Sequence, residues 1–169
     1  MNFVDIAKQR FSVRSYINKE IPQEKLDLIL EAAHVAPTAA NQQPVKLLVV
    51  KSARSKEKLS KAANIYNAPI AIIVCSDSTQ AWTRPFDGKK TTDIDASIIT
   101  DHMMLAATEQ GLGSVWICYF KPDVVKKEFD FPENLEPINI LAIGYTDETT
   151  SVNRHDFQRT PIDELVSYL

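Results

Sequence analysis

The chain has 169 residues, 44% of them hydrophobic and 24% charged, and a formal net charge of -3 at pH 7. This length is typical of one globular domain, and we predict a single domain over residues 1–169. Lysines and arginines are dispersed along the chain, which disfavours a nucleic-acid-binding surface. The longest uncharged apolar stretch, residues 68–76, is too short to span a membrane. Composition therefore predicts a globular protein without nucleic-acid or membrane partners.

The cysteines and the N-terminus bear on the cellular compartment. Cys75 and Cys118 both lie inside apolar runs, and we expect each to be a buried free thiol, which suits a reducing compartment. Residues 1–5 lack the basic region followed by an apolar run that marks a secretory signal. We therefore expect a cytoplasmic protein.

Hydrophobic periodicity and the positions of proline and glycine predict the secondary structure. Asn2 can cap a short first helix, Pro22 fits the first position of a second, and Pro37 should end that second helix. Gly111 should end the longest helical pattern. The expected helices cover residues 2–9, 22–36, 54–64, 91–110, 122–129 and 162–169, and the expected strands cover residues 45–51, 70–75, 114–118 and 138–145. Interleaved helices and about four strands indicate an α/β or α+β fold.

Two loops between these elements differ from ordinary connectors. Residues 36–44 are bracketed by prolines and carry three side-chain amides. Residues 77–91 show no clear period, and we interpret them as a long ordered loop. Loops of that length in a compact domain are often functional.

Residues 10–16 (RFSVRSY) carry two arginines with a serine between them. In an extended segment, Arg10, Ser12 and Arg14 lie on one side of the backbone and the residues between them lie on the other. Guanidinium groups make bidentate, charge-assisted bonds to phosphate oxygens, and a hydroxyl adds a donor. The segment therefore indicates a phosphate-binding face. The alternative is a solvated basic face on a connector.

Known nucleotide-binding loops do not explain how a phosphate would be held. The sequence from Gly111 to Trp116 resembles a dinucleotide-binding fingerprint only superficially, because tryptophan replaces the third glycine. The segment also runs from a helix into a strand, the reverse of the fingerprint. No Walker-type sequence is present. Side chains would therefore bind the phosphate. The candidates are Arg10, Ser12, Arg14 and Arg159.

Metal and hydrolytic sites are not indicated by the sequence. The histidines are separated by tens of residues and form no ligand pair with a cysteine. A Gly-x-Ser-x-Gly elbow is absent. We therefore predict no metal site and no catalytic side chain, and if the chain is an enzyme, its cofactor carries the chemistry.

Five segments, in order along nearly the whole chain, resemble motifs of the nitroreductase family. They are residues 10–16 (RFSVRSY), 30–44 (LEAAHVAPTAANQQP), 105–117 (LAATEQGLGSVWI), 142–145 (AIGY) and 159–166 (RTPIDELV). The resemblance implies an α+β fold with a central, mostly antiparallel sheet flanked by helices. It also implies an obligate homodimer that binds FMN at the subunit interface. Such an enzyme passes electrons from NADH or NADPH through the flavin to nitroaromatics, quinones or flavins by a ping-pong mechanism.

The same resemblance implies which residues hold the phosphate end of FMN. Arg10, Ser12 and Arg14 would hold the phosphate and the ribityl chain, and Arg159 would join them at the phosphate. These are the residues that the side-chain argument above also selects.

The resemblance also implies the surroundings of the isoalloxazine ring. Trp116 and Ile117 would lie along the ring. The partner subunit would contribute a set of residues from the proline-bracketed loop. They are Pro37, Thr38 and Asn41, with Gln43 nearby.

The chain departs from the family pattern after the central strand. Many members have a small residue where this chain has Cys118 and Tyr119, and the larger side chains would reshape the space over the flavin. Two alternatives stay open. A binding module could store, sense or deliver FMN without turnover, with Tyr119 blocking access of nicotinamide. The same scaffold could instead use oxygen or another substrate to alter the flavin itself.

Overall fold

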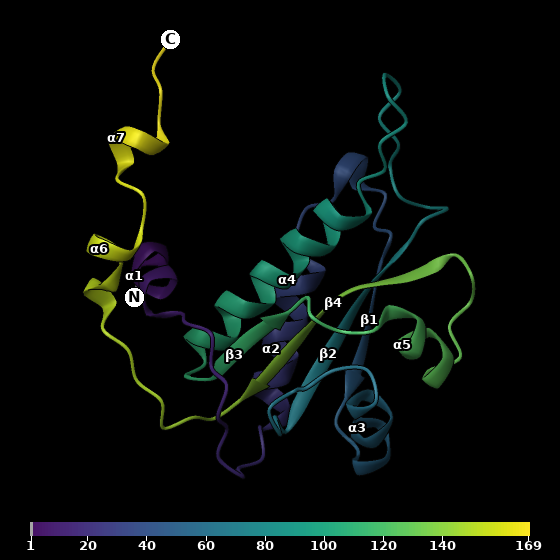
Figure 1. The fold of residues 1–169 in the computed structure, drawn as a ribbon, viewed down its shortest axis with the longest axis horizontal. Helices are drawn as coiled ribbons and strands as arrows, with labels where there is room; N and C mark the ends of the chain where they lie inside the picture. The colour runs from purple at the N-terminus through teal and green to yellow at the C-terminus, as the bar shows by residue number, and fades with distance from the viewer. Residues whose placement is uncertain (1) are drawn as a thin grey trace.

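The computed structural model describes residues 2–169, which fold around a four-stranded sheet (Figure 1). The strands are β1 (Val45–Val50), β2 (Ile70–Asp77), β3 (Gly113–Ile117) and β4 (Leu135–Gly144), in the spatial order β1-β2-β4-β3. Every neighbouring pair is antiparallel. The expected α+β fold with a central antiparallel sheet is confirmed.

Strand β2 lies inside the sheet and is buried along its whole length. The apolar run at residues 70–75 predicts this, because a strand that is covered on both faces needs no alternation of polar residues. Ile72 and Val74 pack into one hydrophobic cluster, whereas Ile73 and Cys75 pack into the other. The sheet therefore separates two cores.

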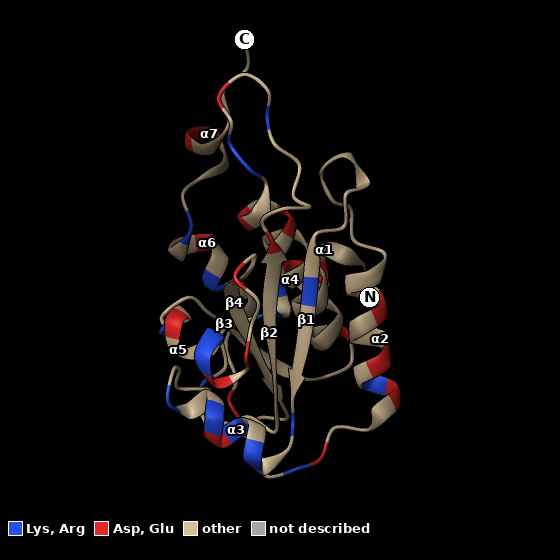
Figure 2. Cartoon of the chain, turned by 90° about the vertical axis from the view of Figure 1, so that its right-hand side faces the viewer, with Lys and Arg blue, Asp and Glu red and all other residues tan. Residues whose placement is uncertain are grey.

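A layer of helices covers each face of the sheet (Figure 1). The helices are α2 (Gln23–His34) and α4 (Thr92–Glu109) on one face, and α3 (Ala53–Ser60) and α5 (Pro122–Glu128) on the other. Ile29 and Met103 are buried in the first core, and Leu59 and Val125 in the second. Acidic and basic residues are interspersed on α2, α3 and α5 (Figure 2). No helix within residues 2–169 has the length and apolarity needed to cross a membrane.

The two ends of the chain meet beside the sheet. Helix α1 (Phe3–Gln9) begins at the predicted cap, where the Asn2 side chain accepts a hydrogen bond of 3.0 Å from the backbone N–H of Asp5. The C-terminal segment passes α1 and then projects away from the sheet (Figure 1). It contains η2 (Val152–Arg154), α6 (His155–Gln158) and α7 (Ile162–Leu165).

Two expected helices are shorter in the structure, for tertiary reasons. The helix expected over residues 54–64 ends at Ser60, because the chain then turns to bury Ala62 in the core. The helix expected over residues 162–169 comprises only α7. Every residue of that range is exposed, and a short helix without a packing surface is marginal in water.

Close packing holds residues 10–14 against the outer edge of β3. A parallel bridge joins Ser12 to Ser114, and the backbone N–H of Val13 donates to the carbonyl of Ser114 at 2.9 Å. The Val13 side chain is fully buried. Gly113 permits this approach, because a Cβ at that position would lie 2.6 Å from Val13 Cγ2.

Gly113→Ala is therefore expected to destabilise the fold by about 1–3 kcal/mol through overpacking, measured by urea unfolding. A Val13→Ala/Gly113→Ala double variant removes the principal clash. It should lose less stability than the sum of the two single variants. If the losses in the free energy of unfolding were strictly additive, the contact with Val13 would not be the cause of the destabilisation.

Candidate functional site

The segment at residues 10–14 presents two faces, as its alternation predicts. Val13 is buried against β3, while Ser12 and Arg14 are exposed and Arg10 is half-buried. Arg14 Nη1 donates to the carbonyl of Ser12 at 3.5 Å, and the backbone N–H of Arg14 donates to the Glu148 carboxylate at 3.1 Å. The hydroxyl of Ser12 and the guanidinium groups of Arg10 and Arg14 therefore belong to the exposed side of this segment, as predicted.

Arginines from the C-terminal segment converge on Arg10. Arg154 Nη2 donates to the carbonyl of Arg10 at 2.6 Å. Burial lowers the pKa of Arg10, and the positive charges of Arg154 and Arg159 lower it further, while Asp101 opposes them. Guanidinium groups that crowd one another in this way favour the binding of an anion.

Two of these three arginines could be predicted and one could not. Arg10 and Arg159 come from segments that resemble family motifs, and Arg159 lies close enough to Arg10 for its charge to lower the pKa of Arg10. Arg154 lies in η2, where no sequence pattern indicates a ligand. Its position depends on how the chain between β4 and α6 returns to α1, which local sequence does not determine.

A cavity of about 170 Å³ lies beside Arg10. Its wall includes Val13, Thr108, Gly113 and Ser114. Ser114 is only 2% exposed, and its Oγ finds no hydrogen-bond partner within residues 2–169. Because an unpaired buried hydroxyl is costly, this group favours a ligand or a water molecule in the cavity.

The other end of β3 borders a second cavity, of about 320 Å³. Trp116 lines it together with Ser97 and Asn139. Trp116 Nε1 and Asn139 Nδ2 are buried donors for which residues 2–169 provide no acceptor. Ile117 points the other way, into the core beneath α3 and α5. Of the two residues expected along the ring, Trp116 therefore presents its side chain here, and Ile117 can offer only its backbone.

The proline-bracketed loop between α2 and β1 has an unusual backbone. Ala40, Asn41 and Gln43 have positive φ values of 49°, 54° and 51°. Thr38 Oγ1 accepts a hydrogen bond of 3.0 Å from the backbone N–H of Gln43, which fixes the turn. Pro37, Asn41 and Gln43 are exposed. Backbone held in this region by non-glycine residues is typical of ligand-binding loops.

Helix α4 separates this loop from the arginines. The backbone N–H of Ala39 donates to Asp95 Oδ1 at 2.8 Å, which anchors the loop to the first turn of α4. Thr108, in the last turn, lines the cavity beside Arg10. At a rise of about 1.5 Å per residue, these two positions lie about 20 Å apart along the helix. One copy of the chain therefore does not bring the loop and the arginines together.

The two cysteines differ, and the expectation for one of them is wrong. Cys75 is a buried free thiol in β2, and burial raises its pKa to about 12. Cys118 is exposed, because β3 ends at Ile117 and the next residue leaves the sheet. Its side chain lines the cavity that also contains Trp116.

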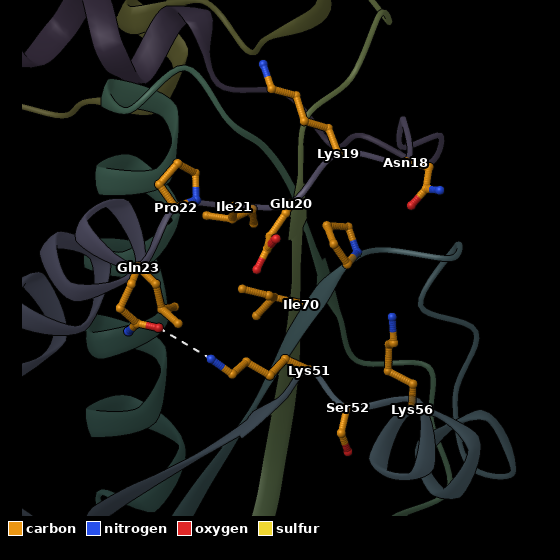
Figure 3. Close-up of a pocket in the computed structure, with 12 residues that line it drawn as sticks. Asn18, Lys19, Glu20, Ile21, Pro22, Gln23, Lys51, Ser52, Lys56 and Ile70 are labelled. Atoms are coloured by element: carbon orange, nitrogen blue, oxygen red, sulfur yellow. Dashed lines mark hydrogen bonds between the residues drawn. The ribbon is translucent and has the colours of Figure 1, made fainter.

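A further cavity, of about 530 Å³, lies away from these residues (Figure 3). Lys19, Glu20 and Lys51 line it, and Lys51 Nζ donates to the side-chain oxygen of Gln23 at 3.3 Å. None of the site residues expected from the sequence borders this cavity.

Comparison with known proteins gives consistent matches. The model of the nitroreductase family matches residues 7–65 and 56–145. A crystal structure of a nitroreductase family protein from Clostridium difficile 630 is 56% identical, covers 99% of this chain and 98% of its own, and superimposes with a TM-score of 0.97. An FMN-dependent nitroreductase from Clostridium difficile R20291 is 28% identical, covers 94% and 97%, and has a TM-score of 0.76.

A curated relative from Methanothermobacter thermautotrophicus is 32% identical over 156 residues, which are 88% of this chain and 79% of the relative. Its name assigns it provisionally as an NADH dehydrogenase/NAD(P)H nitroreductase. The chain therefore belongs to the nitroreductase family, as its sequence motifs indicate.

The difference between the cysteines predicts their reactivity. At pH 8 a thiol-specific disulfide reagent should modify one cysteine of the native protein rapidly, because Cys118 is exposed whereas Cys75 is buried and has its pKa raised to about 12. Cys118→Ser should abolish this rapid phase, and unfolding should restore modification of Cys75. Rapid modification of the native Cys118→Ser variant would contradict the burial of Cys75.

Proposed function

We propose that this chain is an FMN-dependent oxidoreductase that passes electrons from NADH or NADPH to small oxidants. Nitroaromatics, quinones and free flavins are the proposed acceptors, in a ping-pong cycle. Family membership supports an oxidoreductase, and the names of the relatives above support FMN and NAD(P)H. The expected cytoplasmic location remains a prediction.

The observation that carries the proposal is the convergence of cationic side chains beside an unpaired buried hydroxyl. Arg10 and Arg159 lie near each other, with Ser12 and Arg14 exposed on the same segment as Arg10. Ser114 lines the adjoining cavity, and its buried Oγ has no hydrogen-bond partner within residues 2–169. This donor set fits a phosphate group and the hydroxyls of a ribityl chain.

The isoalloxazine ring is proposed to lie towards the far end of β3. Trp116 and the backbone of Ile117 and Cys118 would border it there. A strand rises about 3.3 Å per residue, so the path from Ser114 to Cys118 is about 13 Å long. That path suits an elongated cofactor whose charged end lies at Arg10.

A second copy of the chain is proposed to complete the site. Pro37, Thr38, Asn41 and Gln43 lie at the opposite end of α4 from Arg10, and we propose, as the family resemblance implies, that they contact the flavin bound by a second copy. In a two-fold dimer whose axis crosses α4 near its middle, the N-terminal end of α4 in one copy lies beside the C-terminal end in the other. Exposed apolar residues on α4 and the C-terminal segment support such an interface. They include Ile94, Phe157, Ile162 and Leu165.

The protein's own contribution is positioning and electrostatics. FMN, when bound, would supply the hydride and electron-transfer chemistry between nicotinamide and the oxidant. Arg10, Arg14 and Arg159 neutralise the phosphate, and Asn41 and Gln43 of the second copy supply amides near the ring. Trp116 excludes water from one side of the ring. The scheme assigns no proton transfer to a side chain of the protein.

Tyr119 favours a second candidate function. This residue is 98% exposed and follows Cys118, which lines the proposed ring cavity, although Tyr119 itself lines a separate cavity beside the end of α3. A tyrosine that turned towards the ring would narrow the approach of nicotinamide to the flavin. A module that stores, senses or delivers FMN without turnover is therefore the alternative.

An anaerobic titration with NADH and then NADPH separates the two functions. The purified protein, reconstituted with FMN where needed, should show a flavin spectrum that one of the nucleotides bleaches rapidly. A bound flavin that neither nucleotide bleaches would favour the binding module. Failure to bind FMN at all would contradict both candidates.

Arg14→Ala tests the assignment of the phosphate and ribityl site. Losing a charge-assisted hydrogen bond should weaken FMN binding roughly 10- to 100-fold, measured by fluorescence titration of the apoprotein. Arg54→Ala is the matched control, since Arg54 is an exposed cation on α3, across the sheet from α4. Equal affinities of the two variants would remove Arg14 from the site.

A further inference from the structure

The cavity of about 530 Å³ drawn in Figure 3 forms where three segments of the chain meet. Its walls come from residues 18–23 before and at the start of α2, from residues between 51 and 56 where β1 leads into α3, and from residues 69–70 where β2 begins. Pockets that bind small molecules commonly enclose about 300–1,000 Å³. None of the residues proposed to bind FMN lines this cavity, so it is a candidate site for a different ligand.

The floor of this cavity is apolar and already ordered. Ile21, Leu26 and Ile70 line it, and they are only 6%, 4% and 6% exposed because they also belong to the core between the sheet and helices α2 and α4. Pro22 and Pro69 line it as well, and the ring of a proline fixes φ at its position. An apolar group that covers this floor would leave water without paying to order the protein surface beneath it.

Two lysines line the wall of the cavity that leads into α3. Lys51 follows β1, and Lys56 lies in α3. Neither forms an ion pair within residues 2–169, and the hydrogen bond of Lys51 Nζ is a long one, of 3.3 Å, to the side-chain oxygen of Gln23. Ser52, the N-cap of α3, lines the same wall, so the positive end of the helix dipole adds to the charge of the lysines. This wall favours a carboxylate group.

One carboxylate lines the cavity from the segment before α2. Glu20 forms no ion pair in the part of the chain that the structure describes, and Figure 3 shows Glu20 and Lys51 on opposite sides of Ile70. Lys19, the neighbour of Glu20, directs its ammonium group elsewhere, 4.2 Å from the centroid of the Tyr145 ring. The cavity thus presents a negative and a positive group across an apolar floor. Opposite charges in this arrangement complement a ligand that carries both charges itself.

We propose that this cavity binds an α-amino acid with a large apolar side chain. Lys51 and Lys56 hold its carboxylate, Glu20 accepts hydrogen bonds from its ammonium group, and its side chain covers the apolar floor. A simple anion fits less well because Glu20 repels it, and a simple cation fits less well because the lysines do. The site goes beyond the proposed function, since none of its residues is assigned to FMN.

An NMR titration of the full chain, with FMN present, tests the class of ligand. L-Phenylalanine should bind in the millimolar range or tighter and shift the amide signals of residues 18–23 and 51–56. 3-Phenylpropanoate lacks the ammonium group and 2-phenylethylamine lacks the carboxylate, so each should bind at least about 10-fold more weakly. Glycine, without the apolar side chain, should cause no shifts. No binding of L-phenylalanine, or equal binding of all four compounds, would refute the proposal.

Substitutions on the two walls separate the two charge contacts. Glu20→Gln should weaken binding of L-phenylalanine roughly 10- to 100-fold but should not weaken binding of 3-phenylpropanoate, because a repulsion is removed. The Lys51→Met/Lys56→Met variant should weaken binding of both compounds but not of 2-phenylethylamine. Lys127→Met is the matched control, on the exposed side of α5, and should change none of the affinities. Unchanged affinities in the first two variants, or shifts confined to residues around Trp116, would contradict this site.

Discussion

The candidate site depends on the contact between residues 10–14 and the edge of β3. Val13 buries its side chain there, and its backbone N–H pairs with Ser114. The absence of a side chain at Gly113 allows the two backbones to approach. This contact fixes Arg10 where Arg154 can donate to its carbonyl, and so joins the two ends of the chain at one cluster of positive charge. A packing constraint thus creates the electrostatic feature that favours an anion.

The central sheet and α4 determine how far apart the parts of the site lie. Strand β2 is buried on both faces, so the sheet provides a rigid support for the helices. Helix α4 spans 18 residues, with the arginines near its last turn and the proline-bracketed loop anchored to Asp95 near its first. Two-fold symmetry is the simplest way to bring such separated halves together. The length of α4 therefore keeps this loop away from the arginines of its own chain.

Local sequence predicted the features that depend on neighbouring residues. The apolar run at residues 70–75 gave a doubly covered strand, Asn2 gave a helix cap, and the alternation at residues 10–14 gave the exposed and buried sides. Family motifs added Arg159, which no periodicity indicates. The strand, the cap and the alternating segment need only the residue pattern of a short stretch and the backbone conformation that it prefers.

Features set by distant contacts could not be predicted. Arg154 approaches Arg10 only because the C-terminal segment returns to α1, and Asn139 becomes an unpaired buried donor only once β4 packs beneath α4. Cys118 is exposed because β3 ends one residue earlier than its apolar run suggests. The last four residues lack a surface to pack on, so their helical pattern is not realised.

The most direct test of a shared flavin site is complementation between two defective copies. One copy carries Arg10→Ala and Arg14→Ala, and the other carries Asn41→Gly and Gln43→Gly, which keep the positive φ but remove the amides. Mixed dimers, isolated through two different affinity tags, should regain one FMN site of near wild-type affinity, because one of their two sites combines intact halves. Mixed dimers that bind FMN no better than either parent would contradict a site shared between subunits.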